Sequence, residues 1–563
     1  MNWHACPGSL SAISLNRNQP AVELHSYKFH LFECVGLSLA SFNEEFVLKG
    51  ADITWYPDCL LGVYRYVDLE MTLEARYVDP EVVLIHYRVR NNSERCYQVK
   101  LYGKSKQGSV SSPQAGSCLV EQPVTIKDYR KKPLGEPFAY PHHLMWLVVM
   151  EKRTIEVGEA GEWTSAPIYV APGEVKEGTV FLGTRWLGPF EADPADVWSL
   201  ERKVEYYRKR LEEELVQERR SYWEELLEKV PPVKERYRDN ENYLRLYRQA
   251  WVCIWQNITG SIVTARKTIK GPSASVGKVA LAFNGPAQWE TSLVGLLVSF
   301  IDPDVGIKIV QSVLDSIEDD DFIPEDLIFN RDVHLPTTEA FILEDIYHRT
   351  GKTDFLDRNY EKLYRQLKYH IRHPNFYYLS GDQVIRNMLF NYYSLNSLER
   401  IAILIGKDPQ EIAEIRRLRT EVVRAIESMW EEKWQNSGAF VALFGYATEE
   451  RAKGIVERIR EYHLTPDRFY FLYQEPKGMK GDQEDLTYLK MSLYLYLVLG
   501  LERIEETELL DRIIQKTYDG ITKCGDFWEY YRVTAEPFGN GPMGVFGAFG
   551  WIWALMEKES PYH

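Results

Sequence analysis

The sequence predicts a multidomain protein in which an antiparallel β-sandwich is followed by an all-α ring of helical hairpins. Three observations lead to this fold class. Short strand-like segments fill the first third of the chain, with no helical pattern between them. A charged segment with helical periodicity follows, and the rest of the chain shows helices alternating with loops. With 563 residues, 45% of them hydrophobic and 26% charged, the chain has the composition of a globular protein with more than one folded unit.

The β-sandwich is expected over residues 1–190. Its strand-like segments are rich in Val, Tyr, Leu and Phe, and turn clusters such as Asn91-Asn92-Ser93 separate them. Because no helix lies between them, we expect neighbouring strands to pair in the antiparallel sense. The predicted strands cover 22–37, 45–56, 60–75, 82–89, 96–102, 142–150, 153–157, 164–170 and 178–182.

Residues 191–235 are expected to form a helical linker. Charged side chains dominate residues 194–230, and Pro231-Pro232 ends the helical pattern. We interpret this segment as a solvated connecting helix between the two main domains.

Residues 236–563 form the predicted all-α domain. So many helices could build an open α-solenoid or a closed ring of hairpins, and no repeat of fixed period supports the solenoid. A closed ring carries its ligand at one end, in the loops between helices, so candidate residues are sought in those loops. The predicted helices cover 241–259, 287–301, 303–318, 336–350, 355–372, 391–405, 409–433, 449–461, 484–500, 506–523 and 543–557.

Composition and charge exclude several classes of function. The net charge of −15 argues against a nucleic-acid partner, whose binding depends on neutralising phosphates. The longest apolar stretch, 488–501, contains Lys490 and is too short to cross a membrane. The N-terminus has no signal-peptide pattern, so we expect a cytoplasmic protein. The aromatic fraction of 13% suits either a carbohydrate ligand or an aromatic-rich core.

No cofactor or metal is expected. The adjacent pair His142-His143 has no further ligand at metal-binding spacing, and an apolar strand follows it directly. The sequence contains neither a phosphate-binding loop nor a dinucleotide fingerprint. The presence of a structural calcium ion is an open question, although no loop has the sequence of a calcium site.

Paired carboxyl groups are the chemistry sought in the loops. Hydrolysis of a glycoside with inversion needs one protonated carboxyl to donate to the leaving oxygen and one ionised carboxylate to activate water from the opposite face. Acids in aromatic or glycine-rich loops are the best candidates, because burial there can tune their pKa values. Four segments meet this description: 284–291, 322–336, 378–386 and 526–551.

The order and spacing of these segments resemble the six-hairpin toroid glycosidases of glycoside hydrolase family 63 and, more distantly, the inverting trehalases of family 37. Those enzymes carry a Trp-Asp pair at the start of the second helix and an Asn-Arg loop after it. A general-acid Asp follows in Ser-Gly-x-Asp-x-x-x-Arg, and a general-base Glu lies in Glu-Tyr-Tyr near the C-terminus. The resemblance covers roughly 240–558 and implies an (α/α)6 toroid.

Two carboxylates match the catalytic pair of these enzymes. Asp382 resembles the general acid, although one residue is missing between Gly381 and Asp382. Glu529 resembles the general base. Both assignments have a structural alternative. Asp382 would also suit a helix N-terminus or a turn, and Glu529 would also suit a position on the surface.

The resemblance also implies a set of sugar-binding residues. Trp289-Glu290 stands where the relatives have Trp-Asp, so the acidic side chain is one methylene longer. The Asn-Arg pair of the relatives is present, but the Gln that follows it is lost. The implied substrate-binding residues are Trp289, Glu290, Asn330, Arg331, Arg386, Trp528, Tyr530 and Trp551.

The resemblance therefore implies an inverting glycoside hydrolase acting on α-linked glucosides or related oligosaccharides. Another activity on the same toroid, such as a debranching enzyme, phosphorylase or epimerase, stays open. A non-catalytic carbohydrate-binding protein is the alternative from a different class. The acidic loop 482–485 is a second location for the acid, although its residues also suit the start of a helix. The sequence does not fix the sugar, the linkage or the oligomeric state.

Overall fold

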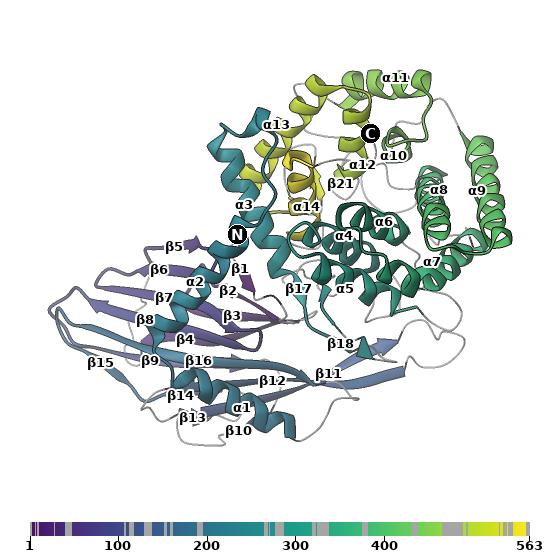
Figure 1. Ribbon diagram of the computed structural model, residues 1–563. Helices are drawn as coiled ribbons and strands as arrows, with labels where there is room; N and C mark the ends of the chain where they lie inside the picture. Colours follow the sequence, from purple (N-terminus) through teal and green to yellow (C-terminus); the bar gives the residue numbers. More distant parts are fainter. Residues whose placement is uncertain are drawn as a thin grey trace. The chain divides into compact units, whose positions relative to one another are not determined.

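A computed structural model shows two compact units, Met1–Glu228 with Ala265–Thr268, and Lys229–Thr264 with Ile269–His563, and each is described by itself (Figure 1). The structure describes residues 3–5, 7, 11–26, 29–39, 48–105, 109–111, 117–128, 138–150, 155–157, 162–187, 195–263, 268–269, 271–275, 286–317, 323, 337–373, 381–430, 437–463, 488–490, 494–528, 530–532, 537–538 and 544–558.

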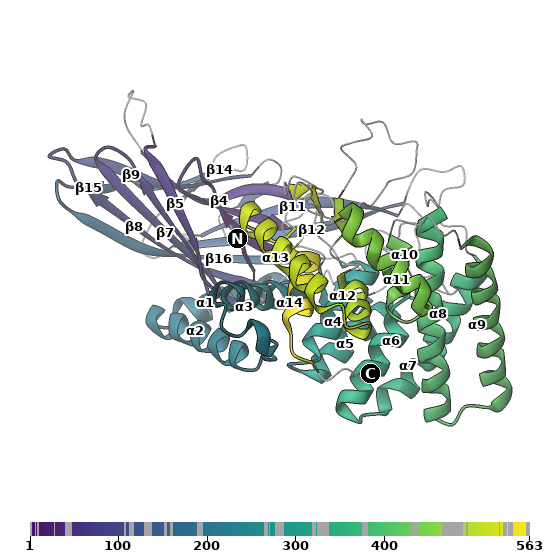
Figure 2. The same cartoon turned by 90° about the horizontal axis from the view of Figure 1, so that it is seen from above.

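The first unit contains two eight-stranded antiparallel sheets, as the strand pattern predicted. Strands of one sheet contact strands of the other, for example β2 with β6 and β3 with β7. Figure 2 shows strands of both sheets, β4 and β9 of one and β7, β8 and β16 of the other. One sheet has the order β1-β2-β3-β4-β9-β14-β13, with β15 also paired to β9; its strands are β1 (Trp3–Ala5), β2 (Ser11–Leu15), β3 (Ala21–Ser26), β4 (Phe29–Leu39), β9 (Tyr97–Ser105), β13 (Ile155–Val157), β14 (Glu162–Ser165) and β15 (Ile168–Val170).

The second sheet shows the alternation of side chains that a sandwich needs. In β6 and the first half of β7, buried residues alternate with partly exposed ones, so one face of the sheet is covered. This sheet has the order β10-β11-β12-β16-β8-β7-β6-β5, with β5 (Gly50–Trp55), β6 (Leu60–Arg65), β7 (Leu69–Asp79), β8 (Val82–Asn91), β10 (Ser109–Ser111), β11 (Ser117–Asp128), β12 (Phe138–Met150) and β16 (Val175–Leu187).

The predicted connecting helix is two helices, α1 (Ala195–Arg208) and α2 (Glu212–Glu228), and both belong to the first unit. They are not fully solvated, because Leu200, Val204 and Leu215 are buried in one cluster with residues of the sheet. The sheet residues of this cluster are Val78, Val82, Leu84, Val149 and Phe181. The buried stripe is narrow among many charged positions, which explains why the sequence indicates a solvated helix.

The second unit is mainly helical. The predicted helices are present with one correction: residues 488–490 of the predicted helix 484–500 form the strand β21, and the helix α12 begins only at Tyr494. The structure adds a short helix, α10. The described helices are α3 (Glu241–Gln256), α4 (Gln288–Val298), α5 (Pro303–Leu314), α6 (Glu339–Thr350), α7 (Asp354–Arg372), α8 (Gly381–Leu404), α9 (Pro409–Met429), α10 (Ser437–Leu443), α11 (Glu449–Arg458), α12 (Tyr494–Arg503), α13 (Thr507–Cys524) and α14 (Gly544–Leu555). Short strands accompany them: β17 (Ile258–Thr259), β18 (Ile262–Val263), β19 (Thr268–Ile269), β20 (Ser273–Ala274), β21 (Tyr488–Lys490), β22 (Tyr530–Arg532) and β23 (Pro537–Phe538).

The even-numbered helices form a closed inner ring. Each of α4, α6, α8, α10 and α12 contacts the next even-numbered helix, and α14 contacts α4, which closes the circle. The odd-numbered helices pack outside: α5 contacts α4 and α6, α7 contacts α6 and α8, and α13 contacts α12 and α14. Burial agrees, since every residue of α4 is buried whereas the long α9 buries only one stripe. The predicted (α/α)6 toroid is confirmed.

Several inner helices run in the same direction. Ser292 in the first turn of α4 donates a hydrogen bond to Glu339 in the first turn of α6, at 2.9 Å. Thr337, two residues before α6, donates a hydrogen bond to Asn391 in the middle of α8 at 2.9 Å, and further along both helices Arg400 binds Glu344 at 2.7 Å. Helices α4, α6 and α8 therefore begin near one end of the ring, which we call the N-terminal end.

The inner helices α12 and α14 follow this direction. Phe300, just after α4, packs edge-on against Trp553 in the last turn of α14, with 6.2 Å between ring centroids. Lys234 binds both Glu502 near the end of α12 and the carbonyl of Ala554 near the end of α14. Helices α12 and α14 thus end where α4 ends, and they also begin at the N-terminal end of the ring.

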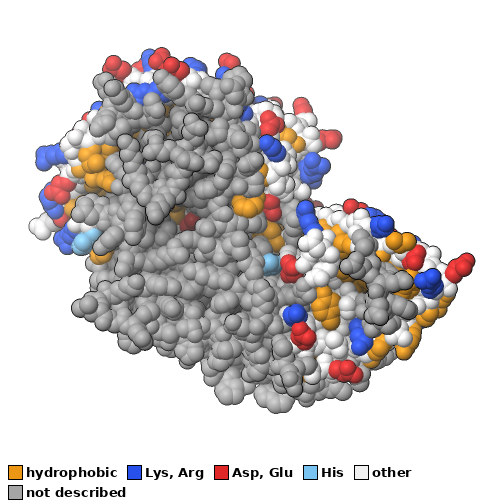
Figure 3. All heavy atoms as spheres, turned by 180° about the vertical axis from the view of Figure 1, so that it is seen from behind, with side chains coloured by type: hydrophobic (Ala, Val, Ile, Leu, Met, Phe, Trp, Pro, Cys, Tyr) orange, Lys and Arg blue, Asp and Glu red, His pale blue; other side chains and the backbone are white. Residues whose placement is uncertain are grey.

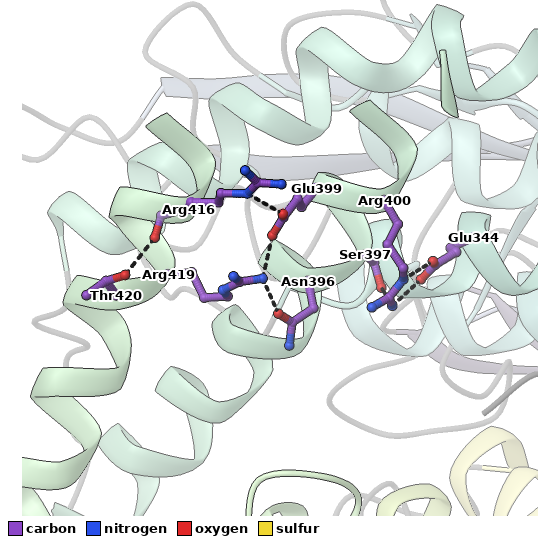
Figure 4. A network of polar contacts seen from close by, with 8 residues as sticks. All are labelled: Glu344, Asn396, Ser397, Glu399, Arg400, Arg416, Arg419 and Thr420. Carbon is purple, nitrogen blue, oxygen red and sulfur yellow. Dashed lines mark hydrogen bonds and ion pairs between the residues drawn. The ribbon is translucent and has the colours of Figure 1, made fainter. Parts of the chain in front are cut away.

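An arginine network fixes the rotation of α8 in the ring (Figure 4). Glu399 accepts hydrogen bonds from Arg416 and Arg419 of α9, the first at 2.6 Å. Glu399 lies on the opposite face of α8 from Phe390, whose ring contacts the inner helices α4 and α12. The face of α8 that carries Phe390 therefore points into the ring.

Candidate functional site

The described parts of three of the four candidate segments lie at, or shortly before, the starts of inner helices. Trp289 and Glu290 lie in the first turn of α4, and Asp382 is the second residue of α8. Trp528 precedes the short strands that lead into α14. Asn330 and Arg331 belong to the stretch between α5 and α6 and lie outside the described residues, as does the acidic loop 482–485. The topology thus places loop segments far apart in the sequence at one end of the ring.

The opening of α4 is tightly packed. Trp289 has 1% of its surface exposed and meets the ring of Phe390 edge-on, with 5.5 Å between centroids. Glu290 is also buried, at 8% exposure. Thr291 anchors the same turn by donating a hydrogen bond to the carbonyl of Ala274 in β20, at 2.7 Å. The turn that carries the predicted sugar-binding pair is therefore held from two sides.

Glu339 is a residue of this region that the sequence reasoning missed. It is fully buried and accepts hydrogen bonds from Gln288 at 3.3 Å, Ser292 at 2.9 Å and Gln366 at 3.1 Å. Burial raises the pKa of its carboxyl, while these hydrogen bonds act in the opposite direction. Gln288 and Ser292 flank Trp289 and Glu290, so Glu339 positions the first turn of α4. The signal in the sequence was Thr337-Thr338-Glu339, a helix start with an acid in its first turn.

Helix α8 begins at Gly381, ten residues before the predicted start at 391, and so contains the predicted acid and the arginine. The side chain of Asp382 lies outside the described residues. Arg386, one turn further along, is 5% exposed. Its Nε donates a weak hydrogen bond to Asn387 at 3.4 Å, and its Nη1 is buried without a hydrogen-bond partner among the described residues.

The segment around the predicted base is held by its neighbours. Glu529 itself lies outside the described residues, as do the side chain of Tyr530 and residues 533–536. Trp528 before it is half-buried, and a Cβ on Gly547 of α14 would lie only 2.8 Å from the Trp528 carbonyl oxygen. After it, β22 pairs with β21 and with β23. The backbone on both sides of Glu529 is thus fixed, by α14 and by a small sheet.

Trp551 lies two turns into α14. It is fully buried, edge-on to Tyr243 of α3 at 5.2 Å and tilted against Tyr518 of α13 at 5.9 Å. These contacts belong to the packing between the outer helices α3 and α13 and the inner helix α14. The sugar contact expected for Trp551 stays a prediction.

Among the residues described, no cluster of three or more His, Cys, Asp or Glu side chains could hold a metal ion. Within the same residues, no helix is both long and apolar enough to cross a membrane.

On the face drawn in Figure 3, the described Lys and Arg side chains are interspersed with Asp and Glu.

Comparisons with solved structures identify the fold. A putative kojibiose phosphorylase from the human microbiome aligns with 98% of this chain and 85% of its own length, at 8% identity and a TM-score of 0.58. A bacterial glucoamylase solved with acarbose aligns with 98% of this chain and 93% of its own length, at 11% identity and a TM-score of 0.58. The chain has the six-hairpin glycosidase fold. A family GH92 α-mannosidase from Bacteroides thetaiotaomicron, in complex with mannoimidazole, also aligns with 97% of this chain and 81% of its own length, at 10% identity and a TM-score of 0.59.

The six-hairpin fold confirms the resemblance drawn from the motifs at the level of architecture. No protein-family model matches the sequence, and no curated protein matches it. The identities of 8% to 11% are too low to carry an activity from these structures to this chain.

Proposed function

We propose that this protein is a carbohydrate-active enzyme, and specifically an inverting glycoside hydrolase acting on α-linked glucosides or related oligosaccharides. The observation that supports this most is that α4, α8 and α14, the helices that follow or contain the motifs of Trp289, Asp382 and Glu529, belong to one closed inner ring and run in the same direction. In this proposal Asp382 protonates the leaving oxygen and Glu529 activates the attacking water. The sugar is held by Trp289, Glu290, Asn330, Arg331, Arg386, Trp528, Tyr530 and Trp551.

The proposed reaction needs no cofactor. Inversion requires the acid and the base on opposite faces of the sugar ring, with about 6.5–9.5 Å between their carboxyl groups so that a water molecule fits. Asp382 opens α8 and Glu529 precedes α14, and these helices do not adjoin in the ring, since α10 and α12 separate them on one side and α4 and α6 on the other. This arrangement suits carboxyl groups that approach a sugar from two sides.

The experiment that tests the proposal is a panel of α-glucosides and α-mannosides followed by NMR. Turnover with the first product formed in the inverted anomeric configuration supports it. Retention of configuration contradicts the paired acid and base. Binding of an oligosaccharide without any turnover would favour a non-catalytic carbohydrate-binding protein.

Phosphorolysis is the second candidate function, because a putative phosphorylase aligns with nearly the whole chain. In that reaction inorganic phosphate replaces the water and the Glu529 base becomes unnecessary. The same panel with and without inorganic phosphate separates the two reactions, since only a phosphorylase requires phosphate and releases a sugar 1-phosphate.

A further inference from the structure

Arg386 carries a buried positive charge that the described part of the protein does not neutralise. Its side chain is 5% exposed, and none of the ion pairs among the described residues involves it. Its one described hydrogen bond is to the neutral amide of Asn387. Its buried Nη1 has no partner among the described residues. Removing a guanidinium from water without a counter-charge is costly, so a buried arginine of this kind calls for an anion.

The direction of the Arg386 side chain follows from helix geometry. Phe390 is four residues further along α8, on the same face, and its ring contacts Trp289 of α4 and Tyr496 of α12. That face points into the ring. Side chains on a helix lean toward its N-terminus, so Arg386 reaches inward and toward the N-terminal end. It therefore points to where the inner helices begin, whose dipoles also favour a negative charge.

The position of Arg386 along the axis of α8 indicates which part of a glycoside it contacts. Asp382, the proposed acid at the leaving oxygen, lies in the first turn of α8, and Arg386 lies four residues deeper, about 6 Å along the helix axis. Although its side chain leans back toward the N-terminal end, Arg386 starts one turn further inside the ring than the proposed acid. We therefore assign it to the sugar that is retained inside the ring rather than to the leaving group.

We propose that Arg386 binds an acidic group carried by the retained sugar, either the carboxylate of a uronic acid or a phosphate monoester. This inference rests on the proposed function, because it uses the same end of the ring. Both groups match the planar fork of a guanidinium, which makes two parallel hydrogen bonds to an oxyanion. Glucose alone would offer only hydroxyl dipoles to the buried charge.

Calorimetric titration of the full-length protein tests the proposal without any need for turnover. The probes are glucuronic acid, glucose 6-phosphate, glucose and inorganic phosphate. We expect at least one acidic sugar to bind about 10- to 100-fold more tightly than glucose, as a charge-assisted contact provides. Tighter binding of glucuronic acid or of glucose 6-phosphate identifies the group. Binding of inorganic phosphate without a preference for either acidic sugar overturns the proposal.

Variants assign the preference to Arg386. Arg386→Met should abolish the preference for the acidic sugar, and Arg386→Lys should keep part of it. The matched control is Arg424→Met, which removes an exposed arginine from the outer helix α9 and should leave the preference unchanged. An acidic-sugar preference that survives in Arg386→Met contradicts the assignment.

Thermal unfolding separates a ligand-binding arginine from a structural one. If Arg386 has no counter-charge within the chain, Arg386→Met removes a buried unpaired charge and raises the Tm of the ligand-free protein, by roughly 2 °C or more. A clear fall in Tm would instead show that a carboxylate of the chain pairs with Arg386, and would overturn the proposal.

Failure of this inference can be distinguished from failure of the proposed function. If acidic sugars bind through Arg386 but no glycoside is turned over, the inference stands and the hydrolase proposal fails. If neutral α-glucosides are hydrolysed and acidic sugars bind no better than glucose, the hydrolase proposal stands and this inference fails.

Discussion

At the scale of single residues, the proposed roles of Asp382 and Glu529 predict different losses of activity. Asp382→Asn and Glu529→Gln keep the side-chain shape but remove the titratable group, so each should lower kcat by about 10²- to 10⁴-fold. On a glycosyl fluoride, whose leaving group needs no proton, Asp382→Asn should recover much of its activity while Glu529→Gln stays inactive. Steady-state kinetics on both substrates measure this difference.

Equal losses on the fluoride would leave the acid and base roles unsupported. Near-normal activity of Asp382→Asn on an unactivated disaccharide would show that the missing residue between Gly381 and Asp382 has moved the acid elsewhere. The loop 482–485 would then be the next segment to test.

The sequence could predict which residues have the chemistry of a site, but not which of them the fold buries. Trp289 and Trp551 are both buried by partners from other helices: Trp289 packs on Phe390, and Trp551 packs on Tyr243 and Tyr518. Glu339 was missed for the same reason, because its partners Ser292 and Gln366 lie on α4 and α7. Contacts between distant segments leave no local pattern to find.

At the scale of elements, the close contact of α14 with the segment before Glu529 predicts a large effect from one methyl group. The Cβ of Gly547→Ala would lie 2.8 Å from the oxygen and 2.9 Å from the nitrogen of Trp528, so this backbone has to move. A displacement of about 1 Å near a catalytic group can cost on the order of 10²-fold in rate. We expect Gly547→Ala to lower kcat by that order, as measured by steady-state kinetics.

The matched control is Gly454→Ala on the outer helix α11, where a Cβ would meet nothing within 4 Å. It should leave kcat unchanged and stabilise the helix by up to about 1 kcal/mol. If both alanine variants behave alike, the contact with Trp528 does not position Glu529.

A second prediction at this scale concerns α2 and the sheet beneath it. His86 of β8 lies 2.9 Å from Glu212, in the first turn of α2. The hydrogen bond to Glu212 raises the pKa of His86 above its ordinary value. The stabilisation from His86 is therefore complete below the ordinary histidine pKa of about 6.5 and is lost as the pH rises through the raised value.

The variant His86→Gln should accordingly lose the most stability near pH 6 and progressively less at higher pH. Urea unfolding of the wild type and the variant between pH 5.5 and 9 measures the difference. A deficit that stays constant over this range would contradict the ion pair.

Periodicity predicted the elements that have a clear apolar face, and it failed where elements are short or where chemistry interrupts the pattern. Helix α10 has only seven residues, less than the window over which helical periodicity can be recognised. The first turns of α8 carry Gly381, Asp382 and Arg386, and these polar residues suggested a loop. Strand β1 has only three residues, and β2 is rich in Ser and Ala, which have little strand preference.

At the scale of the helical unit, the ring is closed by a clasp between its first and last segments. The backbone amide of Lys234 donates to the carbonyl of Leu555 at 2.8 Å, and that of Glu557 donates to the carbonyl of Pro232 at 2.8 Å. Beside these bonds, the ammonium groups of Lys234 and Lys558 share the single carboxylate of Glu502.

This crowding of charge predicts a pH-dependent clasp. Burial, and then the repulsion from Lys234, lower the pKa of Lys558 to about 7. For a lysine whose folded pKa lies below its unfolded value of about 10.5, the penalty is complete below pH 7 and disappears as the pH rises toward 10.5. The wild type should therefore gain stability relative to Lys558→Met between pH 7 and 10, as measured by chemical unfolding at a series of pH values.

Lys558→Met should be the more stable protein at pH 6, because it removes a charge that burial disfavours. The exposed-lysine variant Lys453→Met serves as the control, since Lys453 has 72% of its side chain exposed. A difference between wild type and Lys558→Met that does not change with pH would contradict the lowered pKa.

The clasp also sets the order in which the protein can fold during synthesis. Its two halves are 320 residues apart, as measured between Lys234 and Ala554, so the second half leaves the ribosome only after the helices between them have been synthesised. Until then the earlier hairpins can pair with their neighbours, but α4 has no α14 beside it and the apolar inner helices stay exposed at the gap. The emerging chain is thus an open arc with two apolar ends, and we expect it to aggregate most readily in this interval.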